Sequence, residues 1–128
     1  MYRNQIEKLI KWKDNKNKKP LIIRGARQVG KTWLMKEFWE RYYKNFAYIN
    51  FDRNTRMEQI FSGDMNIERI IQGLKIESGV NITANDTLII FDEVQEVPNA
   101  LTSLKYFYEN APEYNIVAAS SLLRSSNA

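Results

Sequence analysis

Two glycines, a lysine and a threonine stand at a spacing that suits phosphate binding in the stretch GARQVGKT, residues 25–32. A tight loop between a strand and a helix points successive backbone N–H groups inward and forms a nest for oxyanions. Glycine permits positive φ and a close backbone approach, and the N-terminal end of the following helix adds partial positive charge. We therefore expect Lys31 to reach the β- and γ-phosphates of a nucleotide and the Thr32 hydroxyl to bind Mg²⁺.

A pair of carboxylates follows an apolar run in LIIFDE, residues 88–93. Ligands of open α/β sheets bind outside the carboxyl ends of the strands, where this pair would lie. We expect Asp92 to hold the hydration shell of Mg²⁺ near Thr32. The chain has no histidine, so Glu93 is the plausible general base that polarises an attacking water.

Hydroxyl side chains end the stretch NIVAASS, residues 115–121. Ser121 or Ser120 could contact a γ-phosphate or order the water, although a polar strand end without such a role explains the residues equally well. Asp52 follows another apolar stretch in the same way, and we interpret it as turn chemistry rather than as a ligand.

These candidates require strands and helices that alternate. Helices are expected over 3–13, from Lys31 onward, from a capping box of Thr55 and Glu58, over 67–74 with a stop at Gly79, and from Pro98. Strands are expected over 21–24, 46–51, 87–91 and 115–119. The alternation predicts an α/β fold with a mostly parallel sheet of four strands and right-handed crossovers.

The composition limits the classes of function. The net charge is +4, but residues 1–20 carry seven basic and two acidic groups, so the excess lies at one end. Such a segment could contact the phosphates of a nucleic acid or form a solvated helix face. There is no cysteine, which excludes disulfides and thiolate metal sites. The N-terminus has no uninterrupted apolar stretch, so no signal peptide or membrane span is expected, and a cytoplasmic location is the default.

With these stretches in order, the chain resembles AAA-type P-loop ATPases. More narrowly, it resembles uncharacterised bacterial and archaeal members with an N-terminal ATPase domain and a C-terminal domain of unknown function. The similar stretches are IIRGARQVGKT, YINFD, LIIFDEVQEVP and LKYFYENAPEYNIVAASSLL. The resemblance implies a three-layer fold whose five parallel strands lie in the order fifth, first, fourth, third, second, with helices on both faces.

The resemblance also implies ATP or ADP as ligand, Mg²⁺ as cofactor, and a set of site residues. The catalytic residues would be Lys31, Glu93 and Ser121, and the metal would be held by Thr32 and Asp92. The phosphate loop, or Walker A segment, would comprise Gly25, Ala26, Arg27, Gln28, Val29, Gly30, Lys31 and Thr32. Asp92 and Glu93 would form the Walker B pair. Ser120 stands where the family has glycine and Arg124 where it has a small residue.

Such ATPases run to several hundred residues, so we expect the 128 residues to be a truncated ATP-binding domain. Its parts would be a basic helix and linker (1–20), a core (21–123) and a tail unlike the family (124–128). The fifth strand would be missing, leaving Leu21–Arg24 as an exposed edge open to self-association. The expected function is Mg-ATP binding with at most slow hydrolysis. The alternatives are a nucleic-acid-associated protein or a non-functional remnant of a longer ATPase.

Overall fold

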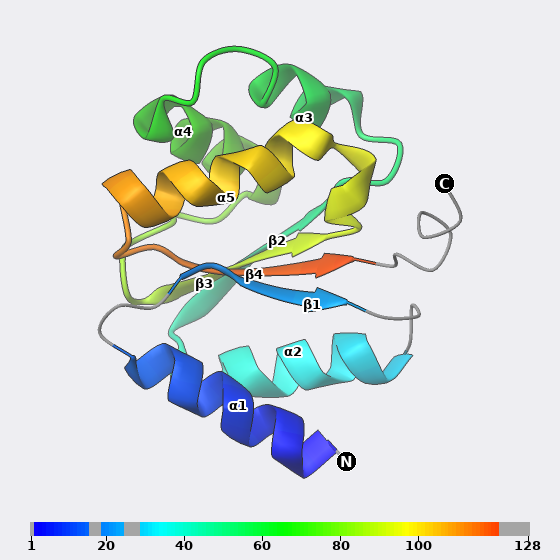
Figure 1. Cartoon of the computed structure of the whole chain (residues 1–128), viewed down its shortest axis with the longest axis vertical. Coiled ribbons are helices and arrows are strands. Elements are labelled where there is room, and N and C mark those ends of the chain that lie inside the picture. Colours follow the sequence, from blue (N-terminus) through cyan, green and yellow to red (C-terminus); the bar gives the residue numbers. More distant parts are fainter. Residues whose placement is uncertain (1, 16–18, 25–28, 121–128) are drawn as a thin grey trace.

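The computed structural model describes the backbone of residues 2–15, 19–24 and 29–120, and the side chains of 7–15, 19–23 and 36–120. Within these ranges, helices and strands alternate around one central sheet, with helices on both faces (Figure 1). The expected α/β architecture is therefore confirmed.

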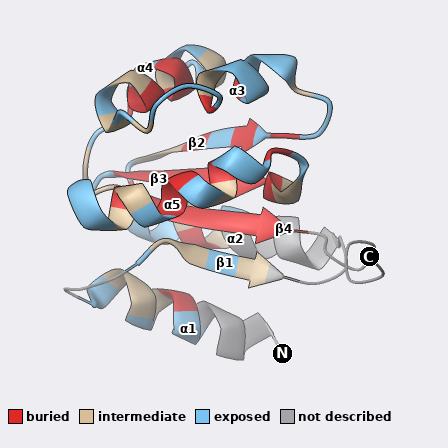
Figure 2. Cartoon of the chain, turned by 45° about the horizontal axis from the view of Figure 1, so that its top comes forward, coloured by how far each residue is buried: buried red, intermediate tan, exposed pale blue. Residues whose placement is uncertain are grey.

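The sheet contains four parallel strands in the order β1-β4-β3-β2. This is the order that the family resemblance implies for its first four strands. The strands are β1 (Leu21–Arg24), β2 (Asn45–Asn50), β3 (Thr87–Asp92) and β4 (Asn115–Ser120). Every residue of the two central strands β3 and β4 is buried, as expected for strands covered on both faces (Figure 2).

One face of the sheet is covered by α1 (Tyr2–Asp14) and α2 (Val29–Tyr42) (Figure 1). Their core residues Leu9 and Phe38 pack with Leu88, Ile90 and other side chains that alternate onto this face of the strands. Burial of Leu9 at 2% exposure makes the basic N-terminal helix part of the folded core.

The opposite face is covered by α3 (Thr55–Ile60), α4 (Ile67–Ser78) and α5 (Pro98–Asn110) (Figure 1). A cluster of aromatic rings lies between these helices and the sheet. Phe91 of β3 makes an edge contact with Phe51 at 5.1 Å between ring centroids and another with Phe61 at 6.0 Å. This packing anchors Phe91, the residue directly before Asp92 at the end of β3.

Most element ends agree with the sequence expectations within one or two residues. Pro98 is the first residue of α5, and Gly79 ends α4 with a φ of 71° in the left-handed region. The expected cap of α3 was wrong by one residue. Asn54, not Thr55, is the cap, because its side-chain oxygen accepts from the Met57 backbone N–H at 3.1 Å.

A short 3₁₀ helix, η1 (Val94–Glu96), follows β3 directly and had no counterpart among the sequence expectations. None of the helices in the described ranges is both long and apolar enough to span a bilayer.

Candidate functional site

The carboxyl ends of all four strands meet at one edge of the sheet. Asn50 at the end of β2 pairs with Asp92 at the end of β3, and Arg24 at the end of β1 pairs with Ser120 at the end of β4. This is the edge at which open parallel sheets bind ligands. The fold thus brings the ends of β3 and β4 to the same side of the sheet as the end of β1, although both are more than 60 residues from β1 in the sequence.

Much of the expected phosphate loop lies outside the described residues. This applies to Gly25, Ala26, Arg27 and Gln28, to the side chains of Val29, Lys31 and Thr32, and to Ser121, whereas Gly30 is described as part of the α2 backbone. The backbone of α2 is described from Val29 onward, in the middle of the expected loop. The segment therefore follows β1 and opens a helix, which is the setting that a phosphate loop requires.

Asp92 is buried at 9% exposure and lies on the α2 side of the sheet. Leu88 and Ile90 pack on that side, and a strand returns to the same face every second residue. Both carboxylate oxygens accept a hydrogen bond: Oδ1 from the Glu93 backbone N–H at 3.0 Å, and Oδ2 from the Tyr48 hydroxyl on β2. The carboxylate is therefore held in a fixed orientation beneath the start of α2.

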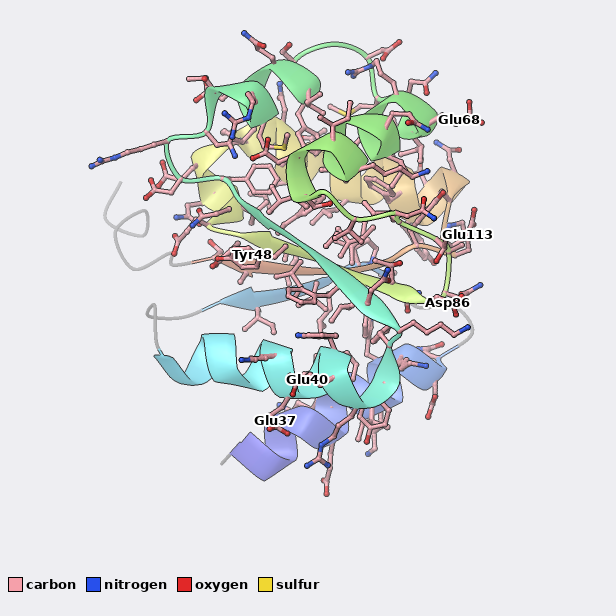
Figure 3. All side chains as sticks on the ribbon, turned by 180° about the vertical axis from the view of Figure 1, so that it is seen from behind. Glu37, Glu40, Tyr48, Glu68, Asp86 and Glu113 are labelled. Atoms are coloured by element: carbon pink, nitrogen blue, oxygen red, sulfur yellow. The ribbon has the colours of Figure 1, made fainter. Side chains whose placement is uncertain are left out.

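Tyr48 lies toward the carboxyl ends of the strands, as Asp92 does, whereas Asp86 and Glu113 lie at the other end of the sheet (Figure 3). Partial desolvation raises the pKa of the Tyr48 hydroxyl above its ordinary value, although the residue is 40% exposed, and its hydrogen bond and proximity to Asp92 raise the pKa further. A raised pKa keeps the proton on the hydroxyl at neutral pH. Tyr48 therefore remains the donor and Asp92 the acceptor.

Glu93 leaves the strand through a left-handed backbone conformation, with φ 55° and ψ 43°. This conformation is uncommon for residues other than glycine, and it costs about 1–3 kcal/mol, so it persists only where the surrounding structure holds it. It turns the chain into η1, where Gln95 Nε2 donates to Glu93 Oε1 at 2.8 Å. Strain of this kind is concentrated at functional sites.

Ser120 is 1% exposed, and its hydroxyl donates to Gln95 Oε1 at 3.1 Å. Alternation along β4 places it on the face of Ile116 and Ala118, which is the α5 side and not the α2 side. Asp52 is exposed, and its backbone N–H donates to Asn50 Oδ1 at 2.9 Å. The side chain that closes this turn is that of Asn50, and Asp52 contributes its backbone N–H, so the interpretation of Asp52 as a turn residue rather than a ligand stays a prediction.

The donor set at this edge suits a hard divalent cation. A buried carboxylate such as that of Asp92 supplies the oxygen ligand that Mg²⁺ prefers, and Mg²⁺ is bound by one or two carboxylates together with phosphates and waters. Among the described side chains, no three acidic groups gather into an all-protein metal cage. The arrangement fits a cation that is shared with a phosphate ligand.

A separate groove of about 800 Å³ lies between the start of α4 and the end of α5. Its lining includes Glu113 and Tyr114, which directly precede the amino end of β4. The groove therefore lies at the opposite end of the sheet from Asp92, and it mixes acidic and basic side chains, including Glu68 and Lys75.

Two residues of the site were missed by the sequence analysis. The position of Tyr48 could have been inferred from the sequence pattern. Asn50 pairs with Asp92 across neighbouring strands, and Tyr48, two residues before Asn50, lies on the same face of the sheet. Gln95 had none, because its placement depends on the left-handed turn at Glu93 and on η1.

Comparisons with known proteins agree with this architecture. The model of a family described as "AAA domain" matches residues 17–128. The solved structure of Caenorhabditis elegans PCH-2 is similar in fold, with a TM-score of 0.57 and 15% sequence identity over 95% of this chain. The chain spans 37% of the length of that protein. No curated protein sequence matched the chain.

Proposed function

The chain belongs to the AAA domain family, whose domains are of a nucleotide-binding, ATPase type, and from this premise we propose that it binds Mg-ATP at the carboxyl edge of its sheet. The observation that carries the proposal is the position of Asp92. A buried, doubly hydrogen-bonded carboxylate lies at the end of a central strand, on the side where α2 follows the glycine loop. Its two hydrogen bonds orient it.

In this proposal the residues of the loop bind and orient the nucleotide. The backbone N–H groups of residues 25–30 and the first turn of α2 surround the phosphates, and Lys31 bonds their outer oxygens. The Thr32 hydroxyl and the Asp92 carboxylate would hold Mg²⁺, which would neutralise the negative charge of the phosphates when bound. Glu93 accepts a hydrogen bond from the attacking water and orients it, and Ser121 assists at the end of β4.

The alternative of nucleic-acid binding through the basic N-terminal segment is less well supported. Lys13 lies over the ring of Tyr43 at 5.2 Å, and Lys19 lies over the ring of Tyr108 at 5.4 Å. These cations therefore contact the protein's own aromatic rings, while Leu9 of the same segment is buried in the core. A segment that is packed in this way presents fewer cations to a phosphate backbone than a free basic tail does.

Calorimetric titration with Mg-ATP tests the proposed binding. The wild-type chain is expected to bind, and Lys31→Ala is expected to weaken binding about 10-fold or more, because a charge-assisted hydrogen bond to phosphate is lost. Lys36→Ala is the matched control, because Lys36 is an exposed lysine on the same helix beyond the expected loop. Equal affinities of the wild-type and Lys31→Ala chains would contradict the proposal.

We propose that hydrolysis by the 128 residues is slow. In the described part of the chain, nothing supplies a lid over the adenine of the nucleotide. In many enzymes such a lid excludes water and completes the site. Turnover of Mg-ATP with Glu93→Gln as the comparison tests this. A fast reaction in the wild-type chain that Glu93→Gln abolishes would contradict slow hydrolysis while supporting Glu93 as the base.

A further inference from the structure

Two hydrogen bonds in series connect the end of β4 to the Glu93 carboxylate through the Gln95 side chain, and a third joins the Glu93 backbone to Asp92 at the end of β3. The Ser120 hydroxyl donates to Gln95 Oε1 at 3.1 Å, and Gln95 Nε2 donates to Glu93 Oε1 at 2.8 Å. The backbone N–H of Glu93 then donates to Asp92 Oδ1 at 3.0 Å. The last two bonds reach both carboxylates of the proposed site.

The chemistry of the groups fixes the direction of this series. An ionised carboxylate only accepts hydrogen bonds, so the amide nitrogen of Gln95 must face Glu93, and its amide oxygen is left for Ser120. The Ser120 hydroxyl must then donate. At 1% exposure this hydroxyl cannot exchange its partner for bulk water, and losing the partner would leave a buried polar group unsatisfied.

The backbone around Glu93 makes the series possible. The left-handed conformation of Glu93 reverses the chain, and the Glu96 N–H donates to the Glu93 carbonyl at 3.0 Å to close the turn. Val94, with no exposed surface, and Val97 anchor η1 in the core. The Gln95 side chain is thereby placed beside the end of β4, within hydrogen-bonding distance of Ser120. Glu96 Oε2 lies 3.4 Å from Gln95 Nε2 and is a second, more distant acceptor.

We propose that Gln95, held by Ser120, is a positioning residue that orients the Glu93 carboxylate and couples it to the end of β4. This inference rests on the proposed function, in which Glu93 orients the attacking water. A change at the end of β4 that moves Ser120 releases the Gln95 amide and, with it, the Glu93 side chain. The serine in place of the family's glycine at position 120 thus gains a role through Gln95 and not through direct phosphate contact.

The first test measures nucleotide affinity and single-turnover hydrolysis for the full chain and for Gln95→Met, which keeps the side-chain length but removes the amide and its hydrogen bonds to Ser120, Glu93 and Glu96. Affinity is expected to stay within about 2-fold, and the hydrolysis rate to fall about 10-fold, since positioning groups act on orientation rather than on binding. Gln72→Met, at an exposed position on α4, is the matched control. Wild-type hydrolysis by Gln95→Met, with nucleotide binding intact, would overturn the inference.

A double variant tests whether Ser120 and Gln95 act together on Glu93, as a relay of hydrogen bonds, or have two separate structural effects. Ser120→Ala is expected to slow hydrolysis by less than Gln95→Met does, and the double variant is expected to be no slower than Gln95→Met alone, because both changes break one series of bonds. Additive losses in the double variant would contradict the coupling.

A measurement that needs no nucleotide separates failure of this inference from failure of the proposed function. The side-chain N–H₂ protons of Gln95 are expected to exchange with water much more slowly than those of the exposed Gln72, and Ser120→Ala is expected to accelerate the Gln95 exchange. Equal exchange rates for the two glutamines would overturn the relay even if nucleotide binds. Protected Gln95 protons without nucleotide binding would leave the relay intact and contradict only the proposed function.

Discussion

At the scale of single residues, the orientation of Asp92 depends on donors from two directions. The Tyr48 hydroxyl comes from the neighbouring strand, and the Glu93 N–H comes from the strained turn that follows. Partners that orient a metal-holding carboxylate are themselves important for metal affinity. Loss of the Tyr48 hydroxyl should therefore change the affinity of the proposed site for Mg²⁺.

Removing the Tyr48 hydroxyl should weaken the dependence of nucleotide binding on Mg²⁺. For Tyr48→Phe we expect about a 10-fold loss in apparent Mg²⁺ affinity, because Asp92 loses one of its two orienting donors. Nucleotide binding in EDTA should be unchanged. Titration of Mg²⁺ at fixed ADP measures both quantities. Tyr42→Phe is the control, because Tyr42 has a similar exposure (37%, against 40% for Tyr48) but lies at the end of α2, and an equal effect of the two variants would contradict the role of Tyr48.

Part of the site could be predicted from residue types and spacing alone. Asp92 could be placed because an apolar strand running into a carboxylate predicts a position at the binding edge of a parallel sheet. Gln95 could not, since its contacts depend on a left-handed residue that sequence patterns do not predict for glutamate. The roles of Lys31, Thr32 and Ser121 remain predictions, as their side chains lie outside the described part of the chain.

At the scale of elements, an ion pair joins α3 to α4 on the face away from α2. Arg56 Nε lies 2.7 Å from Glu77 Oε1, and Arg56 Nη2 lies 3.0 Å from Glu77 Oε2. Asn54, the cap of α3, also donates to Glu77 Oε2 at 3.1 Å. The hydrogen bond from Arg56 lowers the pKa of Glu77, and the bond from Asn54 acts in the same direction.

This pair predicts how stability varies with pH. A lowered pKa in the folded state means that Glu77 stabilises the protein above the unfolded glutamate pKa of about 4.3, and that this contribution is lost as pH falls through the folded value. Glu77→Gln should therefore lower the denaturation midpoint at pH 7 and match the wild-type chain in strong acid. Urea unfolding across this pH range measures the effect. With the exposed Glu40→Gln as control, a midpoint difference that persists in strong acid would contradict the assignment to charge.

The types and order of the elements followed from hydrophobic spacing, but their details did not. Alternating apolar runs predicted four strands and the helices between them, because buried faces impose a period of two or 3.6 residues. The cap of α3 was misplaced because Asn54 and Thr55 are both residue types that cap helices. The 3₁₀ helix η1 has only three residues, too few for any periodic signal.

At the scale of the whole molecule, the strand order places β1 at an edge of the sheet, next to the expected phosphate loop. Ile22 of β1 is 37% exposed, which is unusual for an isoleucine in such a strand. An apolar edge strand is a template for pairing with another chain. The position of β1 thus keeps self-association as a prediction.

Light scattering over a range of protein concentrations tests this prediction. The wild-type chain is expected to form dimers or larger species as concentration rises, and Ile22→Lys is expected to reduce them, because an edge lysine opposes strand pairing. Ile76→Lys is the control, because Ile76 is the most exposed of the large apolar side chains that the structure describes but lies on α4, away from this edge. A monomer at all concentrations would contradict the prediction, as would an equal effect of both lysines.

The most direct test of the central claim is to locate the bound nucleotide. Backbone amide shifts of the ¹⁵N-labelled chain would be followed during titration with Mg-ADP. The account predicts that the largest changes occur at residues 25–32 and at the strand ends near Asn50 and Asp92, with little change along the groove between α4 and α5. Changes concentrated at that groove, with residues 25–32 unaffected, would contradict it.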